Sequence, residues 1–159
     1  MKKRHLFFLV LLSFCLCACG KVYADGIGCV PLADAAVDAA PDEFGYETFG
    51  TEHLTYYFGG TDLPDDFCMR YSTRAEDINE IGVFHCRDED RAKKMLRLTE
   101  DYLVGLKNEK SAFIASYAPE ELPKLESAEA RRFGNYVVYA ILSDQDREAV
   151  FRTVEGMLR

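Results

Sequence analysis

The feature that most constrains the fold is an unbroken run of seven apolar residues at positions 136–142. An apolar run this short, bounded by turn signals, is typical of a strand in the interior of a sheet. The dipeptide Gly134-Asn135 before it is a two-residue hairpin signal of the Gly-first type. After it, Ser143 with Asp146 three residues on resembles a helix capping box. The sequence therefore predicts an outer strand at 128–133, a hairpin turn, a central strand and then a helix.

A similar pattern lies earlier in the chain. Residues 67–72 alternate apolar and polar side chains, which indicates a half-buried strand, and residues 81–86 form a more continuously apolar strand. Asp88 is a good helix cap, and the apolar residues from Ala92 to Tyr117 keep a spacing of three and four, as in one stripe of a long helix. Pro119 ends that helix.

The order strand–strand–helix thus occurs twice, and a shift of 55 residues places Val83 beside Val138 and Phe84 beside Tyr139. We expect an α+β domain in the form of a two-layer sandwich. Its mainly antiparallel sheet has about four strands in ββα-ββα order, with two main helices on one face. A short N-terminal helix at Thr51–Phe58, capped by Thr51 and ended by Gly59 and Gly60, is also expected.

The N-terminus predicts export. Lys2, Lys3 and Arg4 precede an apolar stretch at residues 6–18, which is shorter than the about 20 residues of a transmembrane helix and suits a secretory signal. The stretch ends in Leu16-Cys17-Ala18-Cys19-Gly20, which resembles a bacterial lipoprotein signal. By that resemblance residues 1–18 are removed and Cys19 carries the lipid, because its thiol can take a diacylglycerol and its neighbours are small.

Charge divides the rest of the chain. Residues 22–69 contain ten acidic residues and no Lys or Arg, whereas acids and bases nearly balance from Arg70 onward. Residues 19–44 are rich in Ala, Asp, Gly and Pro, and we interpret them as an acidic flexible tether with room for a short helix near residues 32–40. Residues 45–159 are then the single folded domain.

Three stretches carry a family resemblance: YYFGGTDLPDDF, INEIGVFHCRDEDRAKKM and SYAPEELPKLESAEARRFGNYVVYAILSD. With the lipoprotein signal and the closing helix, they resemble a bacterial lipoprotein family known as domain of unknown function 4358. The resemblance covers residues 45–159. It implies a Gram-positive host and anchoring on the outer face of the cell membrane, and it brings no activity or catalytic residue.

The sequence offers few reactive groups. Three cysteines follow the lipid site, and of these Cys68 and Cys86 could form a disulfide if their strands are neighbours, although buried free thiols are the favoured interpretation. His85 and Cys86 are adjacent on a strand and point to opposite faces, so they form no nucleophile–base pair. We expect no catalytic residue, no metal site and no cofactor. The acidic residues at positions 88, 89, 90, 144 and 146 are interpreted as residues of helix N-termini, where negative charge complements the helix dipole.

One aromatic cluster could serve a ligand. Tyr56, Tyr57 and Phe58 stand before the glycines at 59 and 60, where three rings can form a platform for a sugar or a peptide. The same rings could instead pack a short helix onto the sheet. The sequence leaves both interpretations open.

We expect a non-catalytic binding or adaptor module of the cell envelope, held to the membrane by the lipid on Cys19. Its partner would be an envelope protein that contacts the sheet or the acidic N-terminal region. Two alternatives stay open: an enzyme acting on cell-wall or sugar polymers through two close carboxylates, at least one with a raised pKa, and a module that captures a small ligand or a cation. The net charge of −8 argues against a nucleic-acid partner.

Overall fold

The computed structural model describes residues 21–59 and 64–159. The expected signal at residues 1–18, the lipid site at Cys19 and the glycine at position 60 lie outside these ranges. Among the helices of the described residues, none is both long and apolar enough to span a membrane.

The centre of the molecule is one antiparallel sheet of five strands in the order β1-β2-β3-β5-β4. The strands are β1 (Tyr46–Thr48), β2 (Asp66–Ser72), β3 (Glu80–His85), β4 (Glu129–Phe133) and β5 (Tyr136–Ile141). The α+β class and the four predicted strands are confirmed, and β1 is an additional edge strand. The hairpin between β4 and β5 turns at Gly134 with φ +60°, while Asn135 keeps a negative φ, as a Gly-first turn requires.

The two long helices begin at the predicted caps. Helix α4 (Glu89–Tyr117) starts where the Asp88 side chain accepts a hydrogen bond from the Arg91 amide, and α6 (Asp144–Met157) starts where Ser143 accepts from the Asp146 amide. Between α4 and β4 lie a short 3₁₀ turn, η2 (Pro119–Glu121), and α5 (Leu122–Glu126). Helix α3 (Thr51–Phe58) has the predicted length. The predicted cap is wrong, however, because Thr51 is the first helical residue and Gly50 occupies the cap position.

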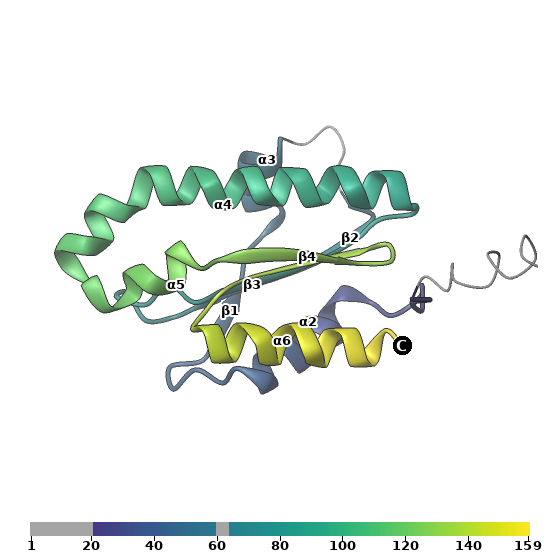
Figure 1. Ribbon diagram of the computed structural model, residues 1–159, viewed down its shortest axis with the longest axis horizontal. Helices are drawn as coiled ribbons and strands as arrows, with labels where there is room; N and C mark the ends of the chain where they lie inside the picture. The colour runs from purple at the N-terminus through teal and green to yellow at the C-terminus, as the bar shows by residue number, and fades with distance from the viewer. Residues whose placement is uncertain (1–20, 60–63) are drawn as a thin grey trace, which may run out of the picture.

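Helices cover both faces of the sheet, so the prediction of two main helices on one face is wrong (Figure 1). Helices α3 and α4 pack on one face, which we call the α4 face, and α6 packs on the other, which we call the α6 face. Successive residues of β3 and β5 alternate between the two: Phe84 and Tyr139 join the α4 face, whereas Val83 and Val138 join the α6 face. Both faces of the central strands are apolar, so each must be shielded from water by packed helices.

The predicted flexibility of the tether is also wrong, whereas the short helix expected near residues 32–40 is present. Residues Cys29–Ala39 form helix α2, which lies beside α6 on the same face of the sheet (Figure 1). Cys29, Leu32, Ala33 and Ala36 are fully buried there, and Asp34 and Asp38 point outward. Small apolar side chains at helical spacing let α2 approach the sheet closely, so the folded unit includes the acidic segment.

Candidate functional site

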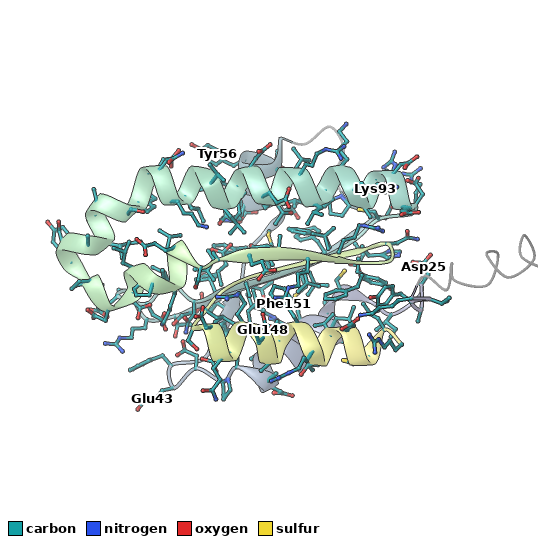
Figure 2. The ribbon with its side chains drawn as sticks, viewed as in Figure 1. Asp25, Glu43, Tyr56, Lys93, Glu148 and Phe151 are labelled. Carbon is teal, nitrogen blue, oxygen red and sulfur yellow. The ribbon has the colours of Figure 1, made fainter. Side chains whose placement is uncertain are left out.

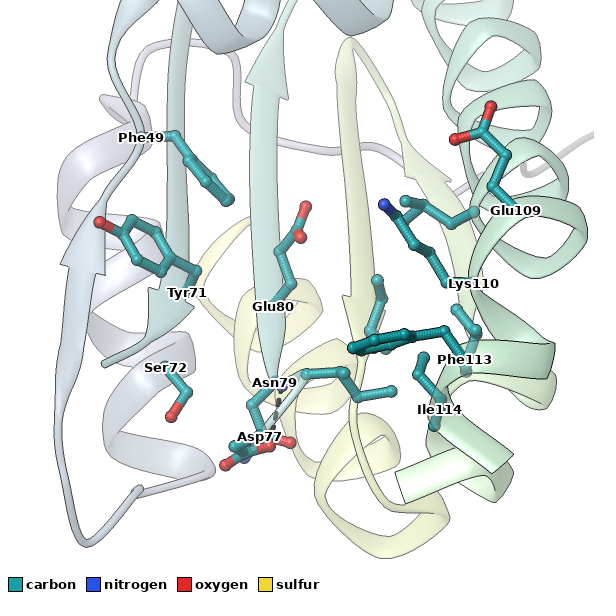
Figure 3. Close-up of a pocket in the computed structure, with 14 residues that line it drawn as sticks. Phe49, Tyr71, Ser72, Asp77, Asn79, Glu80, Glu109, Lys110, Phe113 and Ile114 are labelled. Atoms are coloured by element: carbon teal, nitrogen blue, oxygen red, sulfur yellow. Dashed lines mark hydrogen bonds between the residues drawn. The ribbon is translucent and has the colours of Figure 1, made fainter. Parts of the chain in front are cut away.

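The described structure has a cavity of about 600 Å³ on the α4 face (Figure 3). This volume lies within the range of about 300–1,000 Å³ that is usual for small-molecule sites. Its floor crosses three neighbouring strands through Tyr71, Glu80 and Ile141, which are cross-strand partners. The second half of α4 forms the roof through Leu106, Lys110, Phe113 and other residues.

Glu80 is the one buried carboxylate of the described residues, and it lies on the cavity floor. It starts β3 and points to the α4 face, where it keeps 8% of its accessible surface. The Tyr102 hydroxyl of α4 donates a hydrogen bond to Glu80 Oε1 over 2.8 Å, and the Tyr139 hydroxyl of β5 donates to the same oxygen. The second oxygen, Oε2, accepts no hydrogen bond from the described residues.

Gly82 allows Tyr139 to reach this carboxylate. It is the cross-strand partner of Tyr139, and a Cβ at position 82 would lie 1.9 Å from Cε1 of the tyrosine ring. Without a side chain at Gly82, the ring lies flat across β3 and its hydroxyl extends to Glu80. Tyr139 is fully buried, so its hydroxyl needs this partner.

Burial sets the electrostatics of the site. It raises the pKa of Glu80 from 4.5 to about 7, even though the two tyrosine hydroxyls favour the ionised form. Burial and the nearby carboxylate also raise the pKa of Tyr102 and Tyr139, so both phenols stay protonated and act as donors. No Lys, Arg or His of the described ranges forms an ion pair with Glu80.

Stacked aromatic rings form one wall of the site. The Phe49 ring lies between His53 of α3, at a centroid distance of 3.6 Å, and Tyr71 of β2, at 4.2 Å. Burial lowers the pKa of His53, and its Nε2 atom is buried without a hydrogen-bond partner, so the ring is neutral near pH 7. The Tyr71 hydroxyl donates to Glu47 over 2.7 Å, which fixes the outer ring of the stack.

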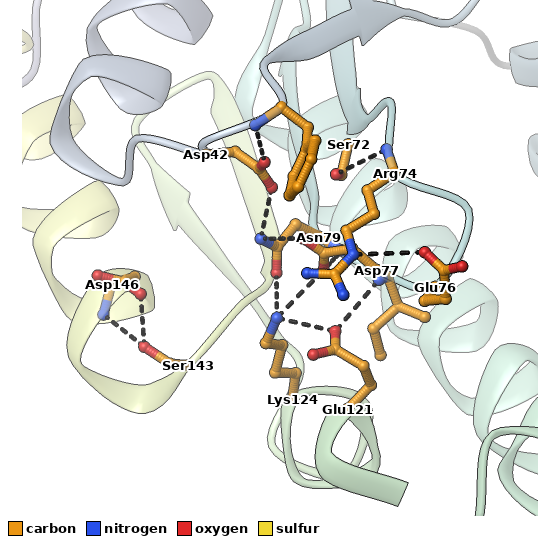
Figure 4. A network of polar contacts seen from close by, with 12 residues as sticks. Asp42, Ser72, Arg74, Glu76, Asp77, Asn79, Glu121, Lys124, Ser143 and Asp146 are labelled. Carbon is orange, nitrogen blue, oxygen red and sulfur yellow. Dashed lines mark hydrogen bonds and ion pairs between the residues drawn. The ribbon is translucent and has the colours of Figure 1, made fainter. Parts of the chain in front are cut away.

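A polar network closes the end of the cavity between the β2–β3 connection and α5 (Figure 4). Lys124 Nζ contacts Asp77 at 3.1 Å, Glu121 at 2.8 Å and Asn79 Oδ1 at 2.9 Å. Asn79 in turn donates to Asp42, on the segment that follows α2. These contacts are partly buried and bind three separate segments together. They neutralise Asp77, so this lining acid is already paired.

The rim of the cavity is exposed. Phe113 keeps 61% of its surface and stacks on Tyr117, one turn further along α4, at a centroid distance of 4.6 Å. Glu109 and Lys110 are exposed beside it. Lys110 forms no ion pair with any described residue.

The predicted aromatic platform is formed only in part. Tyr56 is 81% exposed and lies over α4 in Figure 2, and it lines with Tyr57 a second hollow of about 510 Å³. That hollow shares Leu106, Glu109 and Lys110 with the main cavity. Phe58 instead packs into the core against Phe84, at a centroid distance of 5.2 Å.

The three cysteines of the described residues are buried packing residues with free thiols. Cys68 belongs to the α6 face and Cys86 to the α4 face, so the considered disulfide between them does not form. Cys29 is also a free, buried thiol. Burial raises the pKa of Cys86 to about 11, which suppresses the reactive thiolate.

His85 takes part in no Cys–His pair. Its Nε2 lies 2.6 Å from Asp25 Oδ1, and Asn135 donates to the other oxygen of Asp25. This contact fastens the segment before α2 to the end of β3. Within residues 21–59 and 64–159, no group of three or more Cys, His, Asp or Glu side chains is placed to hold a metal ion.

Sequence reasoning did not single out Glu80, Tyr102, Tyr139 or Phe49. The available signal was weak: an acid at the first position of a continuously apolar strand, two residues from a glycine. Comparisons with known proteins add nothing to this geometry, since no family model, curated protein or solved structure matches the chain.

Proposed function

We propose that this protein is a lipid-anchored, extracytoplasmic binding module that takes up a small molecule in the cavity above Glu80. The observation that carries the proposal is one buried carboxylate on the floor of a largely apolar cavity of about 600 Å³, with an oxygen that accepts no hydrogen bond from residues 21–59 or 64–159. Ligand sites combine apolar walls with a few convergent polar groups in this way. The membrane anchor in the proposal comes from the sequence around Cys19.

The cavity supports binding better than hydrolysis by a pair of carboxylates. Such an enzyme needs two carboxyl groups on either side of one bond. Glu80 has the raised pKa that a general acid needs, but neither of the other acidic residues of the lining forms a catalytic pair with it. Asp77 is paired with Lys124, and Glu109 is exposed on the rim.

An adaptor role through the sheet has less support. Helices α2 and α6 cover one face and helices α3 and α4 cover the other, which leaves the two edge strands β1 and β4 for a partner. The acidic N-terminal segment is folded into α2, and its Asp34 is bound to Arg70 of β2. A protein partner would therefore meet an edge or a helix surface.

A thermal-shift screen with two tryptophan variants tests the proposal. Leu106→Trp fills the cavity from its roof, whereas Val104→Trp places the same ring on an exposed position of the same helix. A bound ligand raises the melting temperature by mass action. We expect compounds from a panel of small amphipathic molecules to stabilise the wild type and Val104→Trp but not Leu106→Trp. Equal shifts in both variants, or flat curves in all three proteins, would contradict the proposal.

A further inference from the structure

We infer that the ligand of this cavity is an organic cation: an apolar body with a protonated or quaternary nitrogen that lies against Glu80 Oε2. The inference rests on the proposed function and names the chemical class of the ligand. Its basis is the geometry around the free oxygen, the aromatic wall and the distribution of charge in the lining.

The free oxygen comes first. An ionised carboxylate offers hydrogen-bonding positions on both oxygens, and here both tyrosine donors use Oε1. Oε2 belongs to a side chain that lines the cavity, and within the described ranges it has no donor. A buried carboxylate without a cationic partner costs free energy. In other proteins, removing one residue of a buried ion pair is strongly destabilising, because the remaining charge has lost its counter-ion. A cationic nitrogen in the cavity supplies both the missing donor and the missing charge.

The walls suit the rest of such a molecule. The stacked rings of Tyr71 and Phe49 lie beside the cavity floor, and Phe113 extends from α4 on the opposite side (Figure 3). Aromatic rings therefore border the cavity that contains Glu80. Aromatic faces attract ammonium groups within about 6 Å of their centroids. The aliphatic residues of the lining offer contacts to a hydrocarbon body; these are Ile78, Leu106, Ile114, Leu125 and Ile141.

A metal ion is a poorer occupant. Ca²⁺ takes about six to eight oxygen ligands, and this floor offers one carboxylate. Asp77 is already bound to Lys124, and Glu109 is an exposed residue of the rim. Glu80 is the buried carboxylate of a lining that is mostly apolar and aromatic, and this matches an organic cation instead.

Binding of a cation should release a proton from Glu80, and this release can be measured. The other charged or titratable groups that face this space are Tyr102, Glu109 and Lys110 of α4, Tyr139 of β5, Tyr71 of β2, Asp77 of the β2–β3 connection and the neutral His53 of α3. Burial raises the pKa of Glu80 to about 7. A bound cation favours the ionised carboxylate, so the Glu80 proton leaves to the buffer when the complex forms near pH 7.

Three probes with one common body test the inference by isothermal titration calorimetry: 2-phenylethylamine, which is cationic, 2-phenylethanol, which is neutral, and 3-phenylpropanoate, which is anionic. We expect the amine to bind most tightly, with proton release, and its affinity to rise about tenfold from about pH 6 to about pH 8 as Glu80 ionises. The affinity of 2-phenylethanol should not rise over this range.

Variants separate the carboxylate from general effects on the fold. Glu80→Gln should abolish the preference for the amine and the pH dependence, while Glu100→Gln, an exposed change on α4, should preserve both. If Glu80→Gln does not fold, Tyr102→Phe provides the test. It removes one donor to Oε1, so the pH at which amine affinity rises should move upward.

The outcomes distinguish the two proposals. Tighter binding of the alcohol or the anion, or amine binding without proton release, overturns the cation inference and leaves the binding function standing. An unchanged amine preference in Glu80→Gln does the same. No binding of any probe up to millimolar concentration contradicts both the cation inference and the proposed function.

Discussion

The two faces of the sheet share the same strands but differ in what they bury. The α6 face holds an apolar core, with Leu32, Phe151 and their neighbours between the helices and the strands. The α4 face buries aromatic rings together with Glu80, Thr99 and Tyr102, and it leaves a cavity of about 600 Å³. Both faces therefore contribute a buried core, and the candidate site lies on the α4 face.

The alternation of β3 makes this division possible. Ile81 and Val83 point into the α6 face, while Glu80, Gly82 and Phe84 point the other way. A shift of the strand by one residue would exchange the two sets and place the carboxylate in the apolar core. The dense packing of the α6 face thus fixes the position of Glu80 on the α4 face.

The largest expected effect lies on the α6 face. Phe151 is buried between α6 and the sheet (Figure 2), and Phe151→Ala should lower the free energy of unfolding by about 3–5 kcal/mol, since it leaves a cavity in a close-packed core. Urea denaturation measures the loss. A cost below about 1 kcal/mol would show that this face is loosely packed.

Next comes the pH dependence of stability that Glu80 introduces. Its pKa rises from 4.5 in the unfolded chain to about 7 in the fold, so the protonated form is favoured by folding. This contribution is fully present below pH 4.5 and is lost as the pH rises through 7. A shift of this size corresponds to about 3 kcal/mol.

The Glu80→Gln variant isolates that contribution. The difference in unfolding free energy between wild type and variant should change by about 3 kcal/mol between acidic and alkaline pH, with the wild type losing stability as the pH rises. Subtraction removes the titration of all other groups, which both proteins retain. A pH-independent difference would mean that Glu80 titrates normally.

A smaller loss of stability is expected at Gly82, because the contact of Tyr139 with Glu80 depends on the absence of a side chain there. Gly82→Ala puts a methyl group 1.9 Å from the Tyr139 ring, which must move. Overpacking of this kind costs about 1–3 kcal/mol. We also expect a changed pKa for Glu80, because the Tyr139 hydroxyl leaves its carboxylate. Unfolding and NMR titration of the same variant measure both effects, and an unchanged pKa would contradict the role given to Gly82.

The smallest effect on stability belongs to the cavity rim. Phe113 is 61% exposed, and Phe113→Ala should change the unfolding free energy by no more than about 0.5 kcal/mol. Binding of 2-phenylethylamine should nevertheless weaken, since an aromatic face is lost. Calorimetry of the variant checks this. Unchanged affinity would place the ligand away from the roof of the cavity.

Local signals in the sequence predicted much of the fold. Asp88 and Ser143 cap the two long helices, Gly134 turns the hairpin, and Pro119 follows the end of α4. Each of these positions depends on residues within a few positions in the chain. The seven-residue apolar run at 136–142 correctly predicted a central strand, but the cover of both its faces by helices was not predicted.

The remaining features depend on contacts that are distant in sequence. The acids of α2 suggested a solvated tether, while its burial depends on α6, more than a hundred residues away. Glu80 is buried because Tyr102 and Tyr139 meet it from another helix and another strand. An acid at a strand end is usually solvated, so no local pattern indicates this site.

The pKa of Glu80 in the free protein tests the central claim most directly. The side-chain carboxyl carbons of ¹³C-labelled glutamate residues can be followed by NMR across a pH titration, with Glu80→Gln used to assign the resonance. The account predicts one carboxyl with a midpoint near 7 that is missing in the variant. If every glutamate titrates near the ordinary value of 4.5, Glu80 is solvated and the buried floor of the cavity is wrong.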